Sequence, residues 1–338
     1  MAVQARRLAG LERSMPMSRK QHRINDWEVY SVVEIQGVKI RIPPPNTIER
    51  LSIVEREEIL ESALAAWMRV DGLRPMNFRL YGPPGVGKNM IVYQLSRWLK
   101  KDLYMVTGHT ELNPEEIACS ARIASNGKIE YVASPLFAAM LRGGIFFFDE
   151  IAKASPAALD PLASVLDDRR TLRSGLACIS LKAHEEFLFC AALNEDEETG
   201  GRLPQFIEER LSPAIAVDIP PAAILKQILR STFPKVEETW IETYLAEFWR
   251  EDISPRDAVT HIQFARALAG RGGKPTGTPQ EIQASLRKAR ACGKSTRVDD
   301  VTTDRPQRPD DTEQSKEMSN GHTPFVVSPK GRRTDRTH

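Results

Sequence analysis

The chain has 338 residues, of which 41% are hydrophobic and 27% charged, and its formal net charge is +2. This composition is ordinary for a globular protein of about two domains, and so small a charge counts against nucleic acid or an anionic membrane as a partner of the whole chain. The sequence contains no apolar run of about 18 residues, the length that spans a bilayer, so we expect a cytoplasmic protein.

The cysteine pattern favours free thiols in a reducing compartment. No two cysteines stand at the C-x-x-C spacing, and no histidine cluster lies near them, so a zinc site is not expected. The four residues are Cys119, Cys178, Cys190 and Cys292.

Residues 1–47 are expected to be an N-terminal extension. Within it, residues 27–43 read WEVYSVVEIQGVKIRIP, and their β-branched residues predict a short hairpin around Gln36 and Gly37. Residues 52–68 read SIVEREEILESALAAWM, with apolar residues at helical spacing and a capping-box pair formed by Ser52 and Glu55. This pattern predicts an amphipathic helix.

Residues 48–220 are expected to form one domain. From Asn77 to about Pro220, short apolar runs alternate with helical stretches, which predicts an α/β fold with a largely parallel sheet. The fully apolar run before Asp149 is typical of a strand buried on both faces. The predicted strands are NFRLY, LYMVTG, GGIFFFDE, EFLFCAALN and PAIAVDIP, and the predicted helices are KNMIVYQLSRWLKK and, after Ser155 as a cap, SPAALDPLASVLDD.

Two hairpin-like segments interrupt the alternation, and a helical region follows it. Residues 121–132 have Asn126-Gly127 at their centre, and residues 170–183 have Ser174-Gly175. Residues 221–291 contain four amphipathic patterns and are expected to form a small all-helical domain. Residues 292–338 are polar and too poor in apolar residues to offset the entropy of ordering, so we expect a disordered tail.

The stretch GPPGVGKN resembles a phosphate-binding loop placed between a strand and a helix. Glycines let backbone N–H groups approach a phosphate, and the lysine adds a full positive charge. Asn89 stands where a serine or threonine hydroxyl usually ligates magnesium. The alternative is a chance match, because so short a pattern is common. The candidate residues are Gly82, Pro83, Pro84, Gly85, Val86, Gly87, Lys88 and Asn89.

Polar residues at other strand ends add a second set of candidates. Asp149 and Glu150 end a buried strand, where ligands bind in open α/β sheets. Asp149 is a candidate magnesium ligand, and Glu150 is a candidate base for an attacking water. Asn194 ends another apolar strand and could hydrogen-bond the same water. The alternatives are two exposed carboxylates and an ordinary turn-starting asparagine.

Two arginines are candidates for stabilising charge on a transferred phosphoryl group. Arg210 lies just before the last predicted strand. Arg256 lies in the first turn of a predicted helix, where its charge opposes the helix dipole. For each, the alternative is a surface cation.

The order of these motifs resembles the AAA+ ATPases, and within them the MoxR-like group of the helix-2-insert clade. The resemblance covers about residues 48–291. It rests on GPPGVGKN (Walker A), GGIFFFDEI (Walker B), AALNE (sensor 1), LPQFIEERL (arginine-finger segment) and SPRDAV (sensor 2). It implies a P-loop NTPase sheet flanked by helices with a small C-terminal all-helical lid domain.

The resemblance also implies ATP and Mg²⁺ at the interfaces of a hexameric ring. Lys88 would bind phosphate, Asp149 magnesium, and Arg256 the nucleotide from the lid. Glu150 would activate water and Asn194 would sense the nucleotide. The resemblance implies a homo-oligomer in which Arg210 acts on the nucleotide of the neighbouring subunit. It also implies a chaperone-like role on a protein client and a partner with a von Willebrand A domain.

The sequence departs from the family at Asn89 and at EERL, where DRF is common, and three functions stay open. The first is an ATP-hydrolysing remodelling enzyme. The second, motivated by Asn89, is a nucleotide-gated scaffold with weak hydrolysis. The third is a nucleic-acid motor, which would need a basic stripe such as Lys128 with Arg169 and Arg170, and against which the net charge counts.

Overall fold

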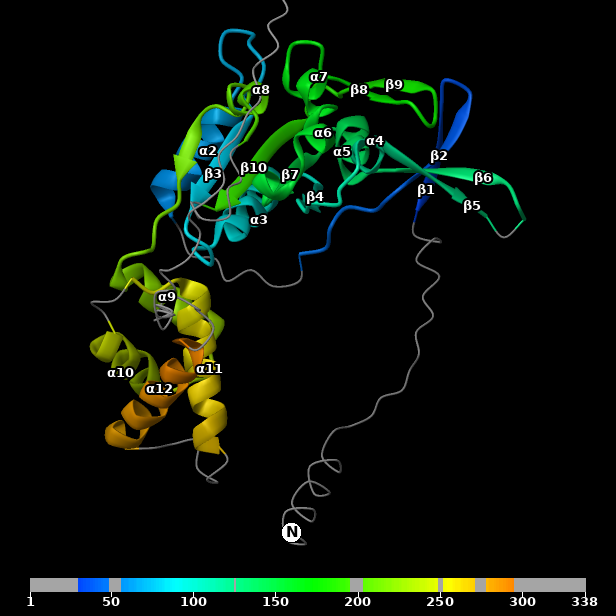
Figure 1. Cartoon of the computed structure of the whole chain (residues 1–338). Helices are drawn as coiled ribbons and strands as arrows, with labels where there is room; N and C mark the ends of the chain where they lie inside the picture. Colours follow the sequence, from blue (N-terminus) through cyan, green and yellow to red (C-terminus); the bar gives the residue numbers. More distant parts are fainter. Residues whose placement is uncertain are drawn as a thin grey trace, which may run out of the picture. The chain divides into compact units, whose positions relative to one another are not determined.

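A five-stranded sheet forms the centre of the computed structural model, which describes residues 30–48, 56–124, 126–194, 203–248, 252–270 and 278–294 (Figure 1). The strand order is β11-β3-β10-β7-β4, and every neighbouring pair is parallel. The predicted α/β class with a parallel sheet is therefore confirmed. The strands are β3 (Phe78–Gly82), β4 (Leu103–Thr107), β7 (Ile145–Asp149), β10 (Leu188–Asn194) and β11 (Ala214–Ala216).

Both faces of this sheet are covered, as the side chains of β7 show. Phe146 and Phe148 pack into one buried cluster, whereas Ile145 and Phe147 pack into another. Successive side chains of a strand point to opposite faces, so this alternation places one cluster on each face. Helices α2 (Glu57–Trp67) and α3 (Lys88–Leu99) contribute to the cluster of Phe147, and α5 (Pro135–Arg142), α6 (Pro156–Leu159) and α7 (Leu162–Leu166) to that of Phe148.

The helix predicted over residues 155–168 is in fact two short helices, α6 and α7. Ser155 caps α6 as predicted, since its Oγ accepts a hydrogen bond from the Ala158 N–H at 3.2 Å. Pro161 separates the two helices. Proline has no N–H to donate and its ring collides with the preceding turn, which explains the break.

Both predicted inserts are hairpins, and the first joins the N-terminal hairpin in a separate sheet. The sheet order is β1-β2-β6-β5, with a short parallel pairing between β2 and β6. The hairpins are β1 (Ser31–Ile35) with β2 (Val38–Ile42), β5 (Cys119–Ile123) with β6 (Ile129–Ala133), and β8 (Thr171–Ser174) with β9 (Ile179–Lys182). The hairpins were predictable from their turns, but their shared sheet was not.

One carboxylate connects three strands of that second sheet. Glu130 on β6 accepts hydrogen bonds from Arg41 on β2 at 3.1 Å and from Arg122 on β5 at 2.6 Å. The Arg41 hydrogen bond, followed by that of Arg122, lowers the pKa of Glu130 to about 2. The carboxylate therefore keeps its charge and both contacts throughout the neutral range.

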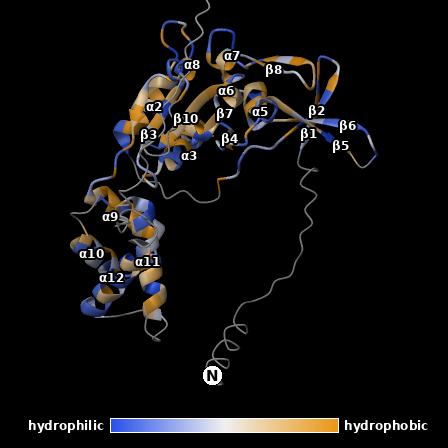
Figure 2. Ribbon diagram, viewed as in Figure 1, coloured by the Kyte–Doolittle hydropathy of each residue, from blue (hydrophilic) through white to orange (hydrophobic). Residues whose placement is uncertain are grey.

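The four predicted C-terminal helices pack around a cluster of their own. Its largest members are Trp240, Tyr244 and Phe248. Figure 2 shows hydrophobic residues and hydrophilic residues side by side along these helices, as amphipathic helices require. The helices are α9 (Ala222–Thr232), α10 (Glu238–Phe248), α11 (Pro255–Gly270) and α12 (Pro279–Lys294).

The remaining short helices are α4 (Pro114–Ala118), η2 (Ile151–Lys153) and α8 (Gln205–Glu208). Helix α12 continues to Lys294, past residue 291, after which the disordered tail was predicted to follow. The predicted capping box of Ser52 and Glu55 and the tail beyond Lys294 lie outside the described residues.

The described residues contain neither a membrane-spanning helix nor a cluster of metal-binding side chains. None of the helices there is long and apolar enough to cross a membrane. Nor does this part of the chain bring together three histidine, cysteine, aspartate or glutamate side chains that could hold a metal ion. All four cysteines are free, with Cys119 and Cys190 buried.

The helical domain is expected to lose stability as the pH falls below neutrality. Burial lowers the pKa of His261 from 6.5, partly opposed by the charge of Asp257, while its Nδ1 lies 3.0 Å from the Tyr244 hydroxyl. Below about pH 6.5 the unfolded chain therefore binds a proton that the folded chain resists, which favours unfolding. His261→Gln should flatten this acid loss, measured as the melting temperature against pH by Trp240 fluorescence.

The exposed His109 gives the matched control. His109→Gln should keep the acid dependence of the wild type. An unchanged dependence in His261→Gln would contradict the assignment.

Candidate functional site

Three of the predicted site residues lie at one edge of the parallel sheet. Gly82 ends β3, Asp149 ends β7 and Asn194 ends β10. The register pairs Asn194 with Gly82 and Asp149 with Thr107 across neighbouring strands. Because all five strands are parallel, their carboxyl ends meet at this edge, which is where ligands bind in open α/β sheets.

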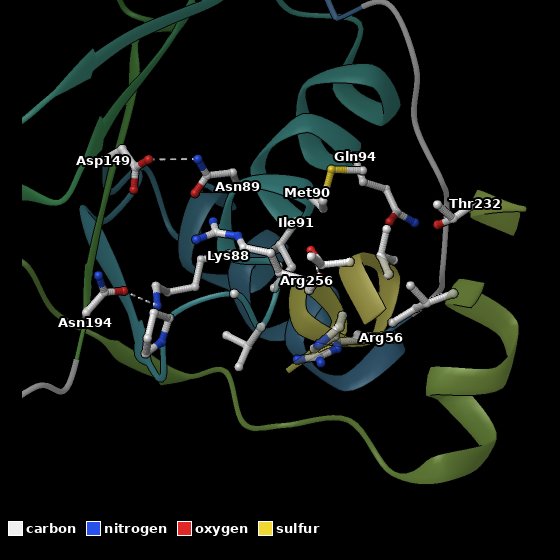
Figure 3. A pocket seen from close by; sticks show the side chains of 18 of the residues that line it. Arg56, Lys88, Asn89, Met90, Ile91, Gln94, Asp149, Asn194, Thr232 and Arg256 are labelled. Carbon is white, nitrogen blue, oxygen red and sulfur yellow. Dashed lines mark hydrogen bonds between the residues drawn. The ribbon is translucent and has the colours of Figure 1, made fainter. Parts of the chain in front are cut away.

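The loop after β3 leads directly into α3 and holds the amino group of Lys88. Gly87 precedes α3 with φ 100°, and no side chain caps the helix. The N–H groups of the first turn have no partner within the helix, so they are available to an anion. Lys88 is 6% exposed, and its Nζ donates to Gly82 O at 2.7 Å, Pro83 O at 3.0 Å and Asn194 Oδ1 at 2.7 Å (Figure 3).

Asn89 and Asp149, the two predicted magnesium ligands, contact each other. Asn89 Nδ2 donates to Asp149 Oδ2 at 2.7 Å (Figure 3). This orients the amide, so its Oδ1 and the second oxygen of Asp149 are the atoms suited to a cation. Burial of Tyr93, and then the nearby charge of Asp149, raise the pKa of the Tyr93 hydroxyl.

Glu150 is held by two contacts and by an unusual backbone. Its Oε2 forms an ion pair with Lys153 Nζ at 2.7 Å, and its Oε1 lies 3.5 Å from Asn194 Nδ2. Its φ is 50°, a left-handed conformation. The glycine at position 108 permits this, since a Cβ there would lie 2.4 Å from Glu150 O.

The C-terminal helical domain of α9 to α12, called the lid below, reaches the phosphate-binding loop through the start of α11. The Arg256 N–H donates to Gly85 O at 3.3 Å, and a Cβ at Gly85 would lie 2.6 Å from Ser254 Oγ. Ser254 also accepts a hydrogen bond from the Asp257 N–H at 3.2 Å, so it caps α11. The side chain of Arg256 extends from α11 into the space beyond the loop (Figure 3).

These elements enclose a cavity of about 440 Å³. This volume lies in the usual range for a small-molecule site. Asp149, Asn89 and Asn194 lie at one end of the cavity, and Gln94, Thr232 and Arg56 lie toward the other (Figure 3). Arg56, Gln94 and the apolar Leu60, Ile91, Ile228 and Val259 also line the cavity and were not predicted from the sequence.

Most of the predicted site residues line this one cavity, and three do not. Pro84, Gly85, Val86, Gly87, Lys88, Asn89, Asp149, Glu150, Asn194 and Arg256 do. Gly82 and Pro83 lie beneath it and accept hydrogen bonds from Lys88. Arg210 lies outside the cavity of its own chain and donates to Phe206 O at 2.6 Å, so its expected action on a neighbouring subunit stays a prediction.

Comparisons with known proteins agree with this architecture. Residues 77–211 match the AAA domain of the dynein-related subfamily, a stretch that runs from β3 to the end of α8. A protein of Staphylococcus epidermidis with the name "Uncharacterized protein" is 30% identical over 183 residues, which cover 52% of this chain and 68% of that protein. This chain belongs to the AAA+ family.

Two further comparisons concern how much of a relative this chain matches and which solved structures share its fold. YojN, an uncharacterised protein of Bacillus subtilis, is 28% identical over 174 residues, which cover 50% of this AAA+ chain but only 56% of YojN. The match thus spans little more than half of that relative. Two variant structures of RuvB from Thermotoga maritima align with TM-score 0.50 at 16% identity over 70% of each chain, a likeness of fold alone.

Replacing Gly85 by alanine should separate the loop from the lid. The new Cβ would meet Ser254 Oγ at 2.6 Å and Arg256 Cβ at 3.0 Å, at a backbone φ of 80°. We expect a lower melting temperature, equivalent to about 1–3 kcal/mol from overpacking in addition to the strain at positive φ.

Gly72→Ala is the matched control, because Gly72 has φ 77° and nothing within 4 Å of the added Cβ. It carries the backbone strain without the clash. Equal losses in the two variants would show that the loop and the lid do not press on each other at Gly85.

Proposed function

We propose that this AAA+ chain binds ATP and hydrolyses it with magnesium. The observation that carries the proposal is the convergence of Lys88, Asp149, Glu150 and Asn194 on one cavity. They come from three separate places in the sequence, and the parallel sheet brings them to one edge. The proposal is also supported by Arg256, which lines the same cavity from the lid.

Binding depends on the loop and on two cations. The N–H groups at the start of α3 and the ammonium of Lys88 would hold the phosphates, and Arg256 would add charge from the lid. The loop suits a bound phosphate, because it approaches the lid closely at Gly85, where there is no side chain between them. The buried, unpaired nitrogens of Gln94 and Arg56 at the far end suit a polar ligand.

Magnesium would be held by Asp149 and Asn89. Carboxylate and amide oxygens are ligands that magnesium accepts, and the hydrogen bond from Asn89 Nδ2 to Asp149 Oδ2 leaves the other oxygen of Asp149 and Asn89 Oδ1 as the candidate ligand atoms. When bound, the ion neutralises charge that develops on the phosphate oxygens.

Hydrolysis would use Glu150 and Asn194 on a water molecule. Glu150 would accept the proton of the water as it attacks the terminal phosphate. Lys88 fixes the carbonyl end of the Asn194 amide, which leaves the NH₂ end facing Glu150. Asn194 can therefore orient a water against the carboxylate.

Ring assembly belongs to the same proposal. The position of Arg210 outside its own cavity supports an action across a subunit interface, and the hairpin of β5 and β6 supports the MoxR-like assignment made from the motifs. A hexamer, a protein client, a partner with a von Willebrand A domain and a chaperone-like, cytoplasmic role rest on that resemblance.

A second candidate, a nucleotide-gated scaffold with weak hydrolysis, is favoured by one contact. The Asn89 amide occupies Asp149 Oδ2, an oxygen that would otherwise face a metal ion. ATP binding would survive, since the loop and Lys88 are intact, but turnover would be slow.

Glu150→Gln should abolish turnover while preserving ATP binding. The amide cannot accept a proton, and losing a general base typically costs about 10²–10⁴-fold in rate. Phosphate release and ATP affinity should be measured in parallel, with Lys88→Ala expected to lose binding.

Glu111→Gln on the exposed surface is the control for the first change, and Lys100→Ala for the second. Equal hydrolysis rates in the wild type and Glu150→Gln would contradict the enzymatic proposal.

Asn89→Thr should raise the hydrolysis rate. The substitution restores a hydroxyl ligand and frees Asp149 Oδ2 from its amide donor, a difference of about 1.5–3 kcal/mol or roughly 10- to 150-fold if felt in the transition state. The rate should be measured against magnesium concentration. A rate and a magnesium dependence unchanged from the wild type would show that Asn89 does not limit turnover.

A further inference from the structure

Two buried donors in the cavity wall have no hydrogen-bond partner. Among the described residues, four buried side-chain nitrogens lack one, and two of these four, Gln94 Nε2 and Arg56 Nη2, belong to residues that line the cavity. Gln94 is only 4% exposed. An unpaired buried donor is costly, and a ligand that supplies an acceptor recovers that cost.

Gln94 lies at the end of the cavity away from the phosphate-binding groups. It follows Lys88 by six residues on α3, which places it roughly 9 Å further along the helix axis. Figure 3 shows the two side chains at opposite sides of the cavity. The lining of the cavity also includes the apolar Leu60, Ile91 and Ile228. Apolar lining side chains together with the buried amide of Gln94 suit a flat aromatic base.

We propose that Gln94 recognises the base of the nucleotide and selects adenine over guanine. This inference rests on the proposed nucleotide binding at Lys88. A carboxamide offers donors on its nitrogen and an acceptor on its oxygen. Adenine presents the acceptor N7 beside the amino donor N6, so Gln94 Nε2 donates to N7 while Oε1 accepts from N6.

Guanine does not fit the same pairing. Along the same edge it presents two acceptors, N7 and O6. Gln94 Oε1 would then face O6 without a proton between them, and a buried polar pair would be left unsatisfied. The contact with Gln94 therefore stabilises bound adenine more than bound guanine.

Arg56 supplies the second donor at this end of the cavity. Its Nη1 donates to Asp218 O at 2.9 Å, which anchors the guanidinium. Burial lowers its pKa, opposed by the charge of Asp218. Arginine is itself a good partner for the two acceptors of guanine. A preference for guanine would therefore assign base recognition to Arg56 and overturn the role of Gln94.

The test compares three diphosphates, which hydrolysis does not consume. ADP, GDP and 7-deaza-ADP, which lacks the N7 acceptor, should be titrated into the full chain by calorimetry. The wild type should bind 7-deaza-ADP and GDP roughly 5- to 150-fold more weakly than ADP. Gln94→Leu should bind all three with similar affinity.

Two further variants keep the result interpretable. Gln227→Leu changes an exposed glutamine of α9 outside the cavity and should keep the wild-type preference. Gln94→Met is a second apolar replacement if leucine disturbs folding. Neither Gln94→Leu nor Gln94→Met should lower the melting temperature of the nucleotide-free protein, because each removes an unpaired buried donor.

The outcomes separate this inference from the proposed function. Tight ADP binding by the wild type with equal affinity for 7-deaza-ADP overturns the role of Gln94 and leaves nucleotide binding standing. A wild type that binds none of the diphosphates overturns both. Loss of discrimination in Gln94→Leu alone, with Gln227→Leu unaffected, supports the assignment.

Discussion

The site depends on how the sheet edge holds one buried positive charge. Lys88 is almost fully buried, and three of its acceptors are neutral oxygens from the end of β3, the loop after it and the end of β10. Asn194 connects Lys88 to Glu150, because its Oδ1 accepts a hydrogen bond from Lys88 and its Nδ2 faces the Glu150 carboxylate. Under the proposed function, an anion bound at Lys88 would act on Glu150 through the Asn194 side chain. The parallel sheet makes this possible by ending its strands together.

Much of this arrangement could be predicted from the sequence because local patterns specify it. A buried strand that ends in Asp149 and another that ends in Asn194 are visible as apolar runs followed by polar residues. Parallel pairing then brings such ends to one edge. The loop glycines and Lys88 form a short motif, and Ser155 has the expected place of a helix cap. Pro161 was a visible helix breaker whose effect was underestimated.

The rest could not be predicted because it depends on contacts between distant segments. Nothing around Gln94 distinguishes it from an ordinary polar residue of an amphipathic helix, and only the assembled cavity shows that it is buried without a partner. The pairing of β2 with β6 joins residues about ninety positions apart through Arg41 and Glu130. The glycine at 108 carries no phosphate-loop signature, yet its missing side chain admits the backbone of Glu150.

The central claim, that the cavity above Lys88 is an ATP and magnesium site, is tested most directly by a crystal structure of Glu150→Gln with ATP and magnesium. The account predicts the phosphates on the loop with Lys88 Nζ turned from Asn194 toward them, magnesium beside Asp149 and Asn89, and the base against Gln94. Nucleotide bound elsewhere, or an empty cavity with Lys88 still donating to Gly82, Pro83 and Asn194 at saturating ATP, would contradict it.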